Sequence, residues 1–192
     1  MELDRYAPMI RREPQLPTVS IPVFETSSEC AGAAASYVLR QVAYRAGAYA
    51  PGIQESLFEE LHTAEHGARI DDVARWFASR GQALVDLGYR LGCRPTSIPT
   101  SELVAWIRVG RGHRGAVLVT NSRLLYPDDS TTPIVHTVGL SIEHSAPDAE
   151  GELAMIDASR TDAIRGPAST LASAHRDRDC LALALHWVGW SL

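Results

Sequence analysis

The hydrophobic pattern of the first half of the chain predicts helices. Small and apolar residues dominate the segment CAGAAASYVLRQVAYRAG, from Cys30 to Gly47, and the glycine is expected to end this helix. Thr26, Ser27 and Ser28 precede it as candidate N-caps, because their hydroxyl groups can accept from the unpaired N–H groups of a first turn. The cysteine therefore opens a helix whose smooth surface can pack closely on a sheet.

Two further helices are expected after the first. One covers about residues 53–64. The next lies in HGARIDDVARWFASRG, where Val73, Trp76 and Phe77 fall at helical spacing and form a stripe that faces the core. Gly81 is expected to end this helix.

From residue 99 onward the pattern changes from helix to strand. A last helix is predicted over 99–109, with Thr100 or Ser101 as its cap. The short β-branched segment GAVLVTNS then predicts a buried strand. PIVHTVGLSIEH and GELAMIDAS predict two more strands, joined as a hairpin by the loop at 145–151.

Helices followed by strands predict an α+β domain in which an N-terminal helical layer packs on a C-terminal antiparallel sheet. Residues 1–22 contain four prolines, which favour an extended arm over a helix. The 192 residues, 45% of them hydrophobic, fit one globular domain over residues 23–192.

Charge and the remaining composition narrow the possible partners. A formal charge of -5 offers no broad basic face, so neither nucleic acid nor an anionic membrane is expected as a partner. No basic segment followed by an apolar run opens the chain, and no apolar stretch is long enough for a membrane span, so we expect a cytoplasmic protein. Three widely spaced cysteines without a CxxC pair favour free thiols over disulfides or a zinc site.

Cys30 is the candidate nucleophile because of its place at a helix start. Unpaired N–H groups and the positive end of the helix dipole favour the thiolate and lower the pKa of a thiol in that position. Cys93 and Cys180 open no helix and lie near no expected base, so they are interpreted as small buried hydrophobic residues.

His136 and Asp157 complete a candidate triad with Cys30. His136 lies in one strand of the predicted hairpin, and Asp157 lies at the end of the other. Paired strands can place the carboxylate against one ring nitrogen and leave the other nitrogen for the sulfur, which is the arrangement of nucleophile, base and orienting residue in cysteine hydrolases. A histidine that only packs in the core is the alternative.

The other histidines have no acidic partner on an adjoining strand. His62 and His66 are four residues apart, with Glu65 between them, as in some metal-binding helices. No third ligand is evident, so neither a metal nor a cofactor is expected.

The order of these segments resembles a known family. A cysteine at a helix start, HGARIDDVARWFASRGQ, a helix leading into GAVLVTNS, then VHTVGLSIEH and ELAMIDAS are similar to the papain-like family of bacteriocin-leader (double-glycine) peptidases and their stand-alone relatives. The resemblance spans residues 27–157. It implies a papain-like fold and hydrolysis of a peptide, isopeptide or side-chain amide bond through a Cys30 thioester.

One departure from the family concerns the oxyanion donor. The family has a glutamine about six residues before the nucleophile, where this chain has Phe24, and the segment Glu-Cys-Ala lacks the family's glycine. Ser28, Thr26 and Ser27 are the candidate replacement donors. A changed oxyanion hole and a protein that no longer hydrolyses a substrate are both compatible with this departure.

Three functions follow from these residues. A hydrolase would pass the acyl group to water, and an acyltransferase would pass it to an amine or alcohol. A non-catalytic member would bind a peptide or protein in the same cleft.

Transglutaminase-like proteins share the order Cys, His, Asp but typically carry an aromatic residue soon after the histidine, where Thr-Val-Gly stands here. The loop 121–132 is interpreted as a substrate-facing lid or as an ordinary surface connection.

Overall fold

A computed structural model describes residues 30–46, 60, 69–86, 91–111, 113–132, 134–141, 152–157 and 163–187. The expected arm 1–22, the helix expected at 53–64 apart from Glu60, the hairpin loop 145–151 and the pair His62 and His66 lie outside these residues.

Two helices open the described part of the chain, and strands with further helices between them follow. The helices are α2 (Cys30–Arg45), α4 (Ile70–Asp86), α5 (Thr100–Val109), α6 (Ser122–Leu125) and α7 (Ala168–Arg176). The strands are β1 (Leu91–Ser97), β2 (Arg114–Asn121), β3 (Val135–Leu140), β4 (Glu152–Ile156), β5 (Ala163–Pro167) and β6 (Leu181–Trp187).

One antiparallel sheet organises these elements. Its six strands lie in the order β1-β6-β2-β3-β4-β5, and every adjacent pair is antiparallel. This arrangement confirms the α+β class and the antiparallel sheet. The pairing of β3 with β4, expected as a hairpin, is present with Gly139 opposite Ile156.

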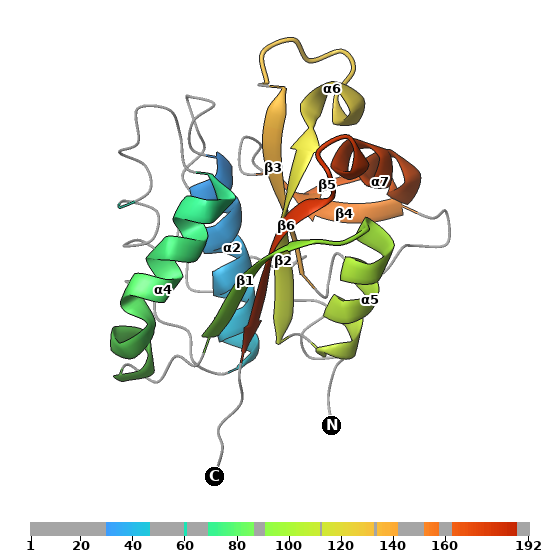
Figure 1. The fold of residues 1–192 in the computed structure, drawn as a ribbon. Coiled ribbons are helices and arrows are strands. Elements are labelled where there is room, and N and C mark those ends of the chain that lie inside the picture. The colour runs from blue at the N-terminus through green and yellow to red at the C-terminus, as the bar shows by residue number, and fades with distance from the viewer. Residues whose placement is uncertain are drawn as a thin grey trace.

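Helices cover both faces of the sheet (Figure 1). On one face, α2 and α4 form an apolar core with Val117 of β2 and with Leu183 and Leu185 of β6. On the other face, α5 and α7 form a second core through Leu103 and Leu171. The second helical layer was not expected from the sequence.

Small residues bring α2 unusually close to the sheet. Ala31, Ala34 and Ala35 are buried on α2, and glycines stand opposite the helix on both strands beneath it. A Cβ at Gly139 of β3 would lie 2.9 Å from Val38 Cγ2 and 3.5 Å from the carbonyl oxygen of Ala34. The absence of side chains at these positions therefore sets the depth at which α2 packs.

Both outer strands were missed in the sequence because their composition is poor for strands. β1 and β5 lie at the two edges of the sheet, and each contains a glycine and a proline. Proline removes a hydrogen-bond donor and is tolerated in edge strands, so it argues against a strand in sequence analysis while being acceptable in this position.

β6 and α7 were also missed. The strand LALALHW is built from leucine and alanine, which favour helices, and its interior is buried on both faces of the sheet. Its strand conformation therefore comes from its neighbours β1 and β2 and not from local propensity.

Two expectations about helix ends were wrong. Gly81 does not end α4, which continues to Asp86 because the next turn buries Leu84 in the first core. Neither Thr100 nor Ser101 caps α5, whose N-cap is Pro99 without a side-chain hydrogen bond. The Thr100 hydroxyl instead forms a 2.9 Å hydrogen bond with Nδ1 of His175, which ties α5 to α7.

No helix in the described part of the chain is long and apolar enough to span a membrane.

Two glycine substitutions should change stability in opposite directions. Gly115→Ala would place a Cβ in overlap with Val38, a buried and β-branched side chain, and 3.0 Å from the carbonyl oxygen of Leu140, so we expect a loss of about 1–3 kcal/mol. Gly81→Ala adds a Cβ with nothing within 4 Å in a helix interior and should add about 0.5–1 kcal/mol. Urea unfolding of both variants would measure this; equal effects would contradict close packing at Gly115.

Candidate active site

The first turn of α2 positions Cys30. The helix begins at this residue and carries no acidic side chain in its first turn. Its unpaired N–H groups and the positive end of its dipole therefore act near the sulfur without a competing carboxylate on the same turn. The thiol is free and partly exposed.

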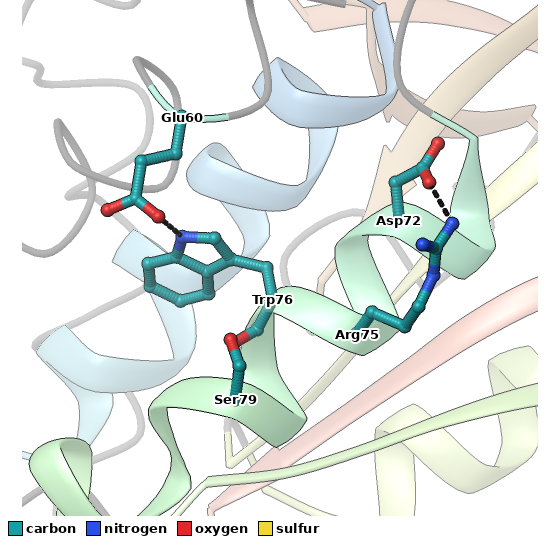
Figure 2. Close-up of a pocket in the computed structure, with 5 residues that line it drawn as sticks. All are labelled: Glu60, Asp72, Arg75, Trp76 and Ser79. Atoms are coloured by element: carbon teal, nitrogen blue, oxygen red, sulfur yellow. Dashed lines mark hydrogen bonds and ion pairs between the residues drawn. The ribbon is translucent and has the colours of Figure 1, made fainter.

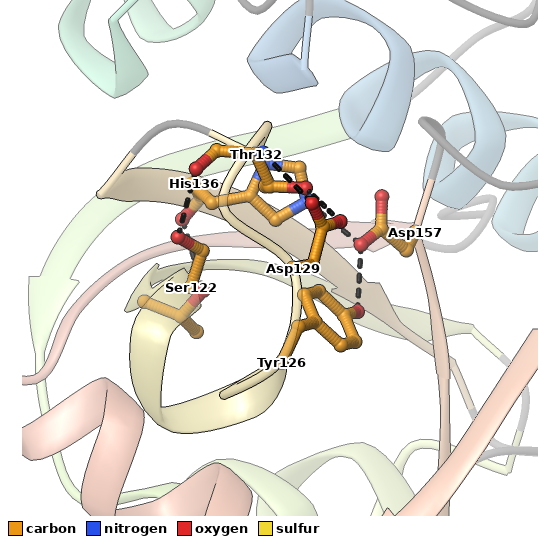
Figure 3. A network of polar contacts seen from close by, with 7 residues as sticks. Ser122, Tyr126, Asp129, Thr132, His136 and Asp157 are labelled. Atoms are coloured by element: carbon orange, nitrogen blue, oxygen red, sulfur yellow. Dashed lines mark hydrogen bonds and ion pairs between the residues drawn. The ribbon is translucent and has the colours of Figure 1, made fainter.

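His136 and Asp157 form a buried hydrogen-bonded pair (Figure 3). Nε2 of His136 lies 2.8 Å from Oδ2 of Asp157, and each residue is 1% exposed. This contact leaves Nδ1 as the second ring nitrogen. Nδ1 is buried and completes no hydrogen bond within the described residues.

The register of β3 and β4 explains this contact. Gly139 is opposite Ile156, and continuing that register by one residue places Val138 opposite Asp157. His136 is two residues from Val138 and therefore on the same face of the sheet. Diagonal neighbours on paired strands are close enough for long side chains to meet.

Thr137 and His136 reach Cys30 from opposite faces of β3. Alternation along the strand points Thr137 and Gly139 toward α2, whereas Val138 belongs to the core beneath α5 and α7. Within the described residues β4 pairs with β3 at a single position, Gly139, so the edge of β3 beside His136 is not covered by β4. We therefore infer that the ring of His136 approaches the sulfur at this edge.

The electrostatics of the site favour a charged pair. Burial raises the pKa of the Cys30 thiol, but hydrogen bonding and charge interaction with His136, together with weaker effects of Thr137, outweigh burial and hold that pKa below its ordinary value. Burial lowers the pKa of His136, while Asp157 and Cys30 raise it to about 9. A thiolate beside an imidazolium is the state that both shifts favour.

Cys30 and His136 lie close together, but they do not form a completed hydrogen bond. Cys30 and His136 are near enough to shift each other's pKa, yet the geometry at Nδ1 is not that of a completed hydrogen bond. Catalytic contacts often tighten only when substrate binds, so this proximity is compatible with His136 acting as the base.

Tyr126 is a site residue that sequence analysis did not identify as one. Its hydroxyl donates to Oδ2 of Asp157 at 2.6 Å, the same oxygen that His136 contacts (Figure 3). The Tyr126 and His136 rings are also edge to face, with centroids 6.4 Å apart. An aromatic residue shortly before the strand of a candidate base was the available signal, but its loop was interpreted as a substrate-facing lid or an ordinary surface connection.

Internal hydrogen bonds hold the segment that carries Tyr126. The side chain of Asp129 accepts from the backbone N–H and hydroxyl of both Thr131 and Thr132, and these bonds hold the pKa of its carboxyl well below the usual range. The backbone N–H of Ser122 donates to the carbonyl of Ile134 at 3.0 Å. The loop 121–132, which contains α6, is therefore stabilised by its own hydrogen bonds, and it holds Tyr126 against Asp157.

The other cysteines and histidines of the described residues are not at this site. Cys93 lies on β1, and burial raises the pKa of its thiol to about 12. His175 is buried between Thr100 and the carbonyl of Leu181, and burial lowers its pKa. The structure therefore brings together Cys30, His136 and Asp157, whereas Cys93 packs, partly buried, against the first core.

The oxyanion candidates Thr26, Ser27 and Ser28 lie outside the described residues, and their role stays a prediction. Within the described residues no group of three or more His, Cys, Asp or Glu side chains is arranged to hold a metal ion.

An open surface hollow of about 320 Å³ lies beside α4 and is separate from these residues. Figure 2 shows its lining, in which the Trp76 indole donates to Glu60 at 2.9 Å. Asp72, Arg75 and Ser79 complete the lining. None of these residues belongs to the group around Cys30. The candidate active site is therefore identified by its reactive side chains and not by the volume of a surface hollow.

No protein-family model matches the chain, and no curated protein matches it in sequence. Similar solved structures include a crystal structure from Bacillus anthracis described as a candidate C39-like peptidase, with a TM-score of 0.56 and 15% sequence identity over 93% of this chain and 96% of that chain. At this identity the likeness shows the fold alone. The chain therefore has a C39-peptidase-like fold, which is consistent with the papain-like architecture; the bacteriocin-leader family is not confirmed.

Cys30 should be the first thiol to react with a limiting dose of iodoacetamide at mildly acidic pH. Its lowered pKa leaves more thiolate than Cys93, whose thiol stays protonated. Intact-protein and peptide mass spectrometry would locate the label, and His136→Gln should slow labelling of Cys30 without accelerating labelling of Cys93. First labelling of Cys93 or Cys180 would show that the nucleophile is assigned wrongly.

Proposed function

We propose that this protein is a cysteine hydrolase that cleaves a peptide, isopeptide or side-chain amide bond. Cys30 is the nucleophile, His136 the base and Asp157 the residue that orients the histidine. The observation that supports this assignment most strongly is the buried His136–Asp157 contact, which presents the second ring nitrogen to a cysteine at a helix start.

The reaction follows from the charges at the site. The proton of the Cys30 thiol moves to Nδ1 of His136, and the thiolate attacks the carbonyl carbon of the substrate. The tetrahedral intermediate collapses to a thioester as the imidazolium gives its proton to the departing amine. Water then attacks the thioester, with His136 taking its proton, and the acid product leaves as the sulfur regains a proton.

Asp157 contributes by orienting and stabilising the imidazolium. Oδ2 accepts from Nε2, so the ring presents Nδ1 to the sulfur throughout the reaction. A carboxylate in this position stabilises the positive ring without itself taking the proton. Its complete burial keeps water from competing for the same oxygen.

Two alternatives use the same residues. An acyltransferase would admit an amine or alcohol in place of water, and a non-catalytic member would bind a peptide or protein beside Cys30. The C39-like fold favours a peptide or protein substrate. We place hydrolysis first because the favoured thiolate–imidazolium state serves a binding protein in no evident way.

We also propose Tyr126 as a positioning residue. Its hydroxyl contacts Asp157 and its ring contacts His136, so it touches both members of the pair. Because it shares Oδ2 with His136, it limits the orientations that the carboxylate can adopt.

The thioester can be tested without knowing the natural substrate. With p-nitrophenyl acetate we expect Cys30 to acquire the acetyl group, release p-nitrophenolate and then return to the free thiol. Intact-protein mass spectrometry would detect the acetyl-enzyme. Hydroxylamine or a primary amine, added at several concentrations, would separate acyl transfer from hydrolysis by the product formed.

Matched controls use the other thiols. Cys30→Ala should abolish acetylation, whereas Cys93→Ala should leave it unchanged, because Cys93 is partly buried in β1 and stays protonated. A wild-type protein that forms no thioester with this ester or with peptide vinyl sulfones, while remaining folded, would favour the binding function.

The rate of acetylation should show a bell-shaped dependence on pH. The active pair requires an ionised Cys30, whose pKa lies below its ordinary value, and a protonated His136, whose pKa is about 9. The rate should therefore rise as Cys30 ionises, hold through neutral pH, and fall as His136 loses its proton near pH 9. A profile that only rises through the ordinary range of a free thiol would contradict the paired state.

Tyr126→Phe should lower kcat/KM for p-nitrophenyl acetate by about tenfold. The variant keeps the ring packed on His136 but removes a hydrogen bond to a charged oxygen, which contributes about 1.5 kcal/mol. The alkaline limb of the pH profile should also move upward, because Oδ2 loses a competing donor and binds the imidazolium more strongly. If Tyr126→Phe lowers thermal stability but leaves the pH profile of acetylation unchanged, Tyr126 has only a structural role.

A further inference from the structure

The packing of α2 on β3 places a second residue of β3 beside Cys30. A Cβ at Gly139 would meet Val38 Cγ2 and the carbonyl oxygen of Ala34. Two residues earlier on β3 is Thr137, about 6.6 Å back along the strand. Four residues before Ala34 on α2 is Cys30, about 6 Å back along the helix. The two steps match, so Thr137 faces Cys30 across the helix–sheet interface.

The hydroxyl of Thr137 has no other role among the described residues. Thr137 is 5% exposed, and its Oγ1 is buried and completes no hydrogen bond there. A buried hydroxyl without a partner costs about 1–3 kcal/mol, so such a group calls for an explanation. The neighbouring Thr120 is different, because its hydroxyl donates to the backbone carbonyl of His136 at 3.0 Å.

The Thr137 hydroxyl acts on the sulfur of Cys30, although it completes no hydrogen bond with it. The hydroxyl and the backbone N–H of Thr137 both act on Cys30 and favour its ionised form. A neutral thiol is a poor acceptor, whereas a thiolate is a charged one and forms a stronger hydrogen bond. An incomplete bond at Oγ1 is therefore expected beside a protonated sulfur and should close when the sulfur ionises.

We propose that Thr137 is a second donor to the Cys30 thiolate, acting through its hydroxyl beside His136. The role rests on the proposed function in so far as the thiolate is the nucleophile. Consecutive residues of β3 then hold the sulfur from opposite sides of the strand. When the thioester breaks down, the same hydroxyl stabilises the thiolate that leaves, so the donor assists deacylation as well as the resting state.

The proposal can be tested by the pH dependence of Cys30 alkylation in the full chain. Rates with iodoacetamide are measured by peptide mass spectrometry across a pH series for wild type, Thr137→Val and Thr137→Ser. Thr137→Val should move the midpoint of the rate–pH curve, which reports the ionisation of Cys30, upward by about one pH unit. Labelling at pH values below that midpoint then slows about tenfold. Thr137→Ser should keep the wild-type midpoint, because it retains the hydroxyl.

The plateau rate at high pH gives a readout that a structural defect would not reproduce. A thiolate that loses a donor becomes more basic and somewhat more nucleophilic, so the plateau of Thr137→Val should equal or exceed that of wild type. Thr100→Val is the matched control, since Thr100 is also a buried threonine but bonds His175 in the other core. Its midpoint should stay at the wild-type value.

Several results would overturn the proposal. One is a folded Thr137→Val protein with the wild-type midpoint, and another is a Thr137→Ser protein shifted as far as Thr137→Val. If Thr137→Val does not fold, Thr137→Ala removes the same hydroxyl with less bulk, and the same midpoint shift decides the outcome. Alkylation requires no acyl substrate. Absence of an acetyl-enzyme would therefore count against the proposed function, whereas the midpoint shift of the Thr137 variants would still decide this proposal.

Discussion

The close packing of α2 on β2 and β3 is the constraint on which the candidate site depends. Glycines on both strands and alanines on the helix let their backbones approach to a depth that side chains would prevent. Because α2 packs at this depth, its first residue, Cys30, meets the beginning of β3. The positions of the sulfur and of its neighbours are thus set by one interface and not by flexible loops.

A buried carboxylate supplies the second condition. Asp157 is removed from water, and two donors, the His136 ring and the Tyr126 hydroxyl, contact one of its oxygens. A charge in such a place is stable only with such partners, so the carboxylate, ring and phenol form one polar unit inside an apolar surrounding. The loop 121–132 completes that unit, because its Tyr126 connects the ends of β2 and β3 to Asp157 at the end of β4.

The sequence was most informative where a local rule applied. The small residues after Cys30 predicted a helix that could pack closely, the β-branched run predicted the buried β2, and the turn at 145–151 predicted the pairing of β3 with β4. Local rules failed for β6, where leucine and alanine favour helix, and for β1 and β5, where glycine and proline are tolerated only because these strands lie at sheet edges. Gly81 misled because a helix can continue through glycine when its next turn buries an apolar residue.

By itself the sequence determined the α+β class, a cysteine at a helix start, and a histidine and an aspartate on neighbouring strands. Those features follow from patterns within a few residues, which propensity and alternation can read. Only the tertiary structure decided that His136 and Asp157 share a face, that Tyr126 reaches the same oxygen, and that Thr137 faces the sulfur. These contacts depend on strand register and on the depth of helix packing, which join residues as far apart in the chain as Cys30 and Thr137 and leave no mark in any local pattern.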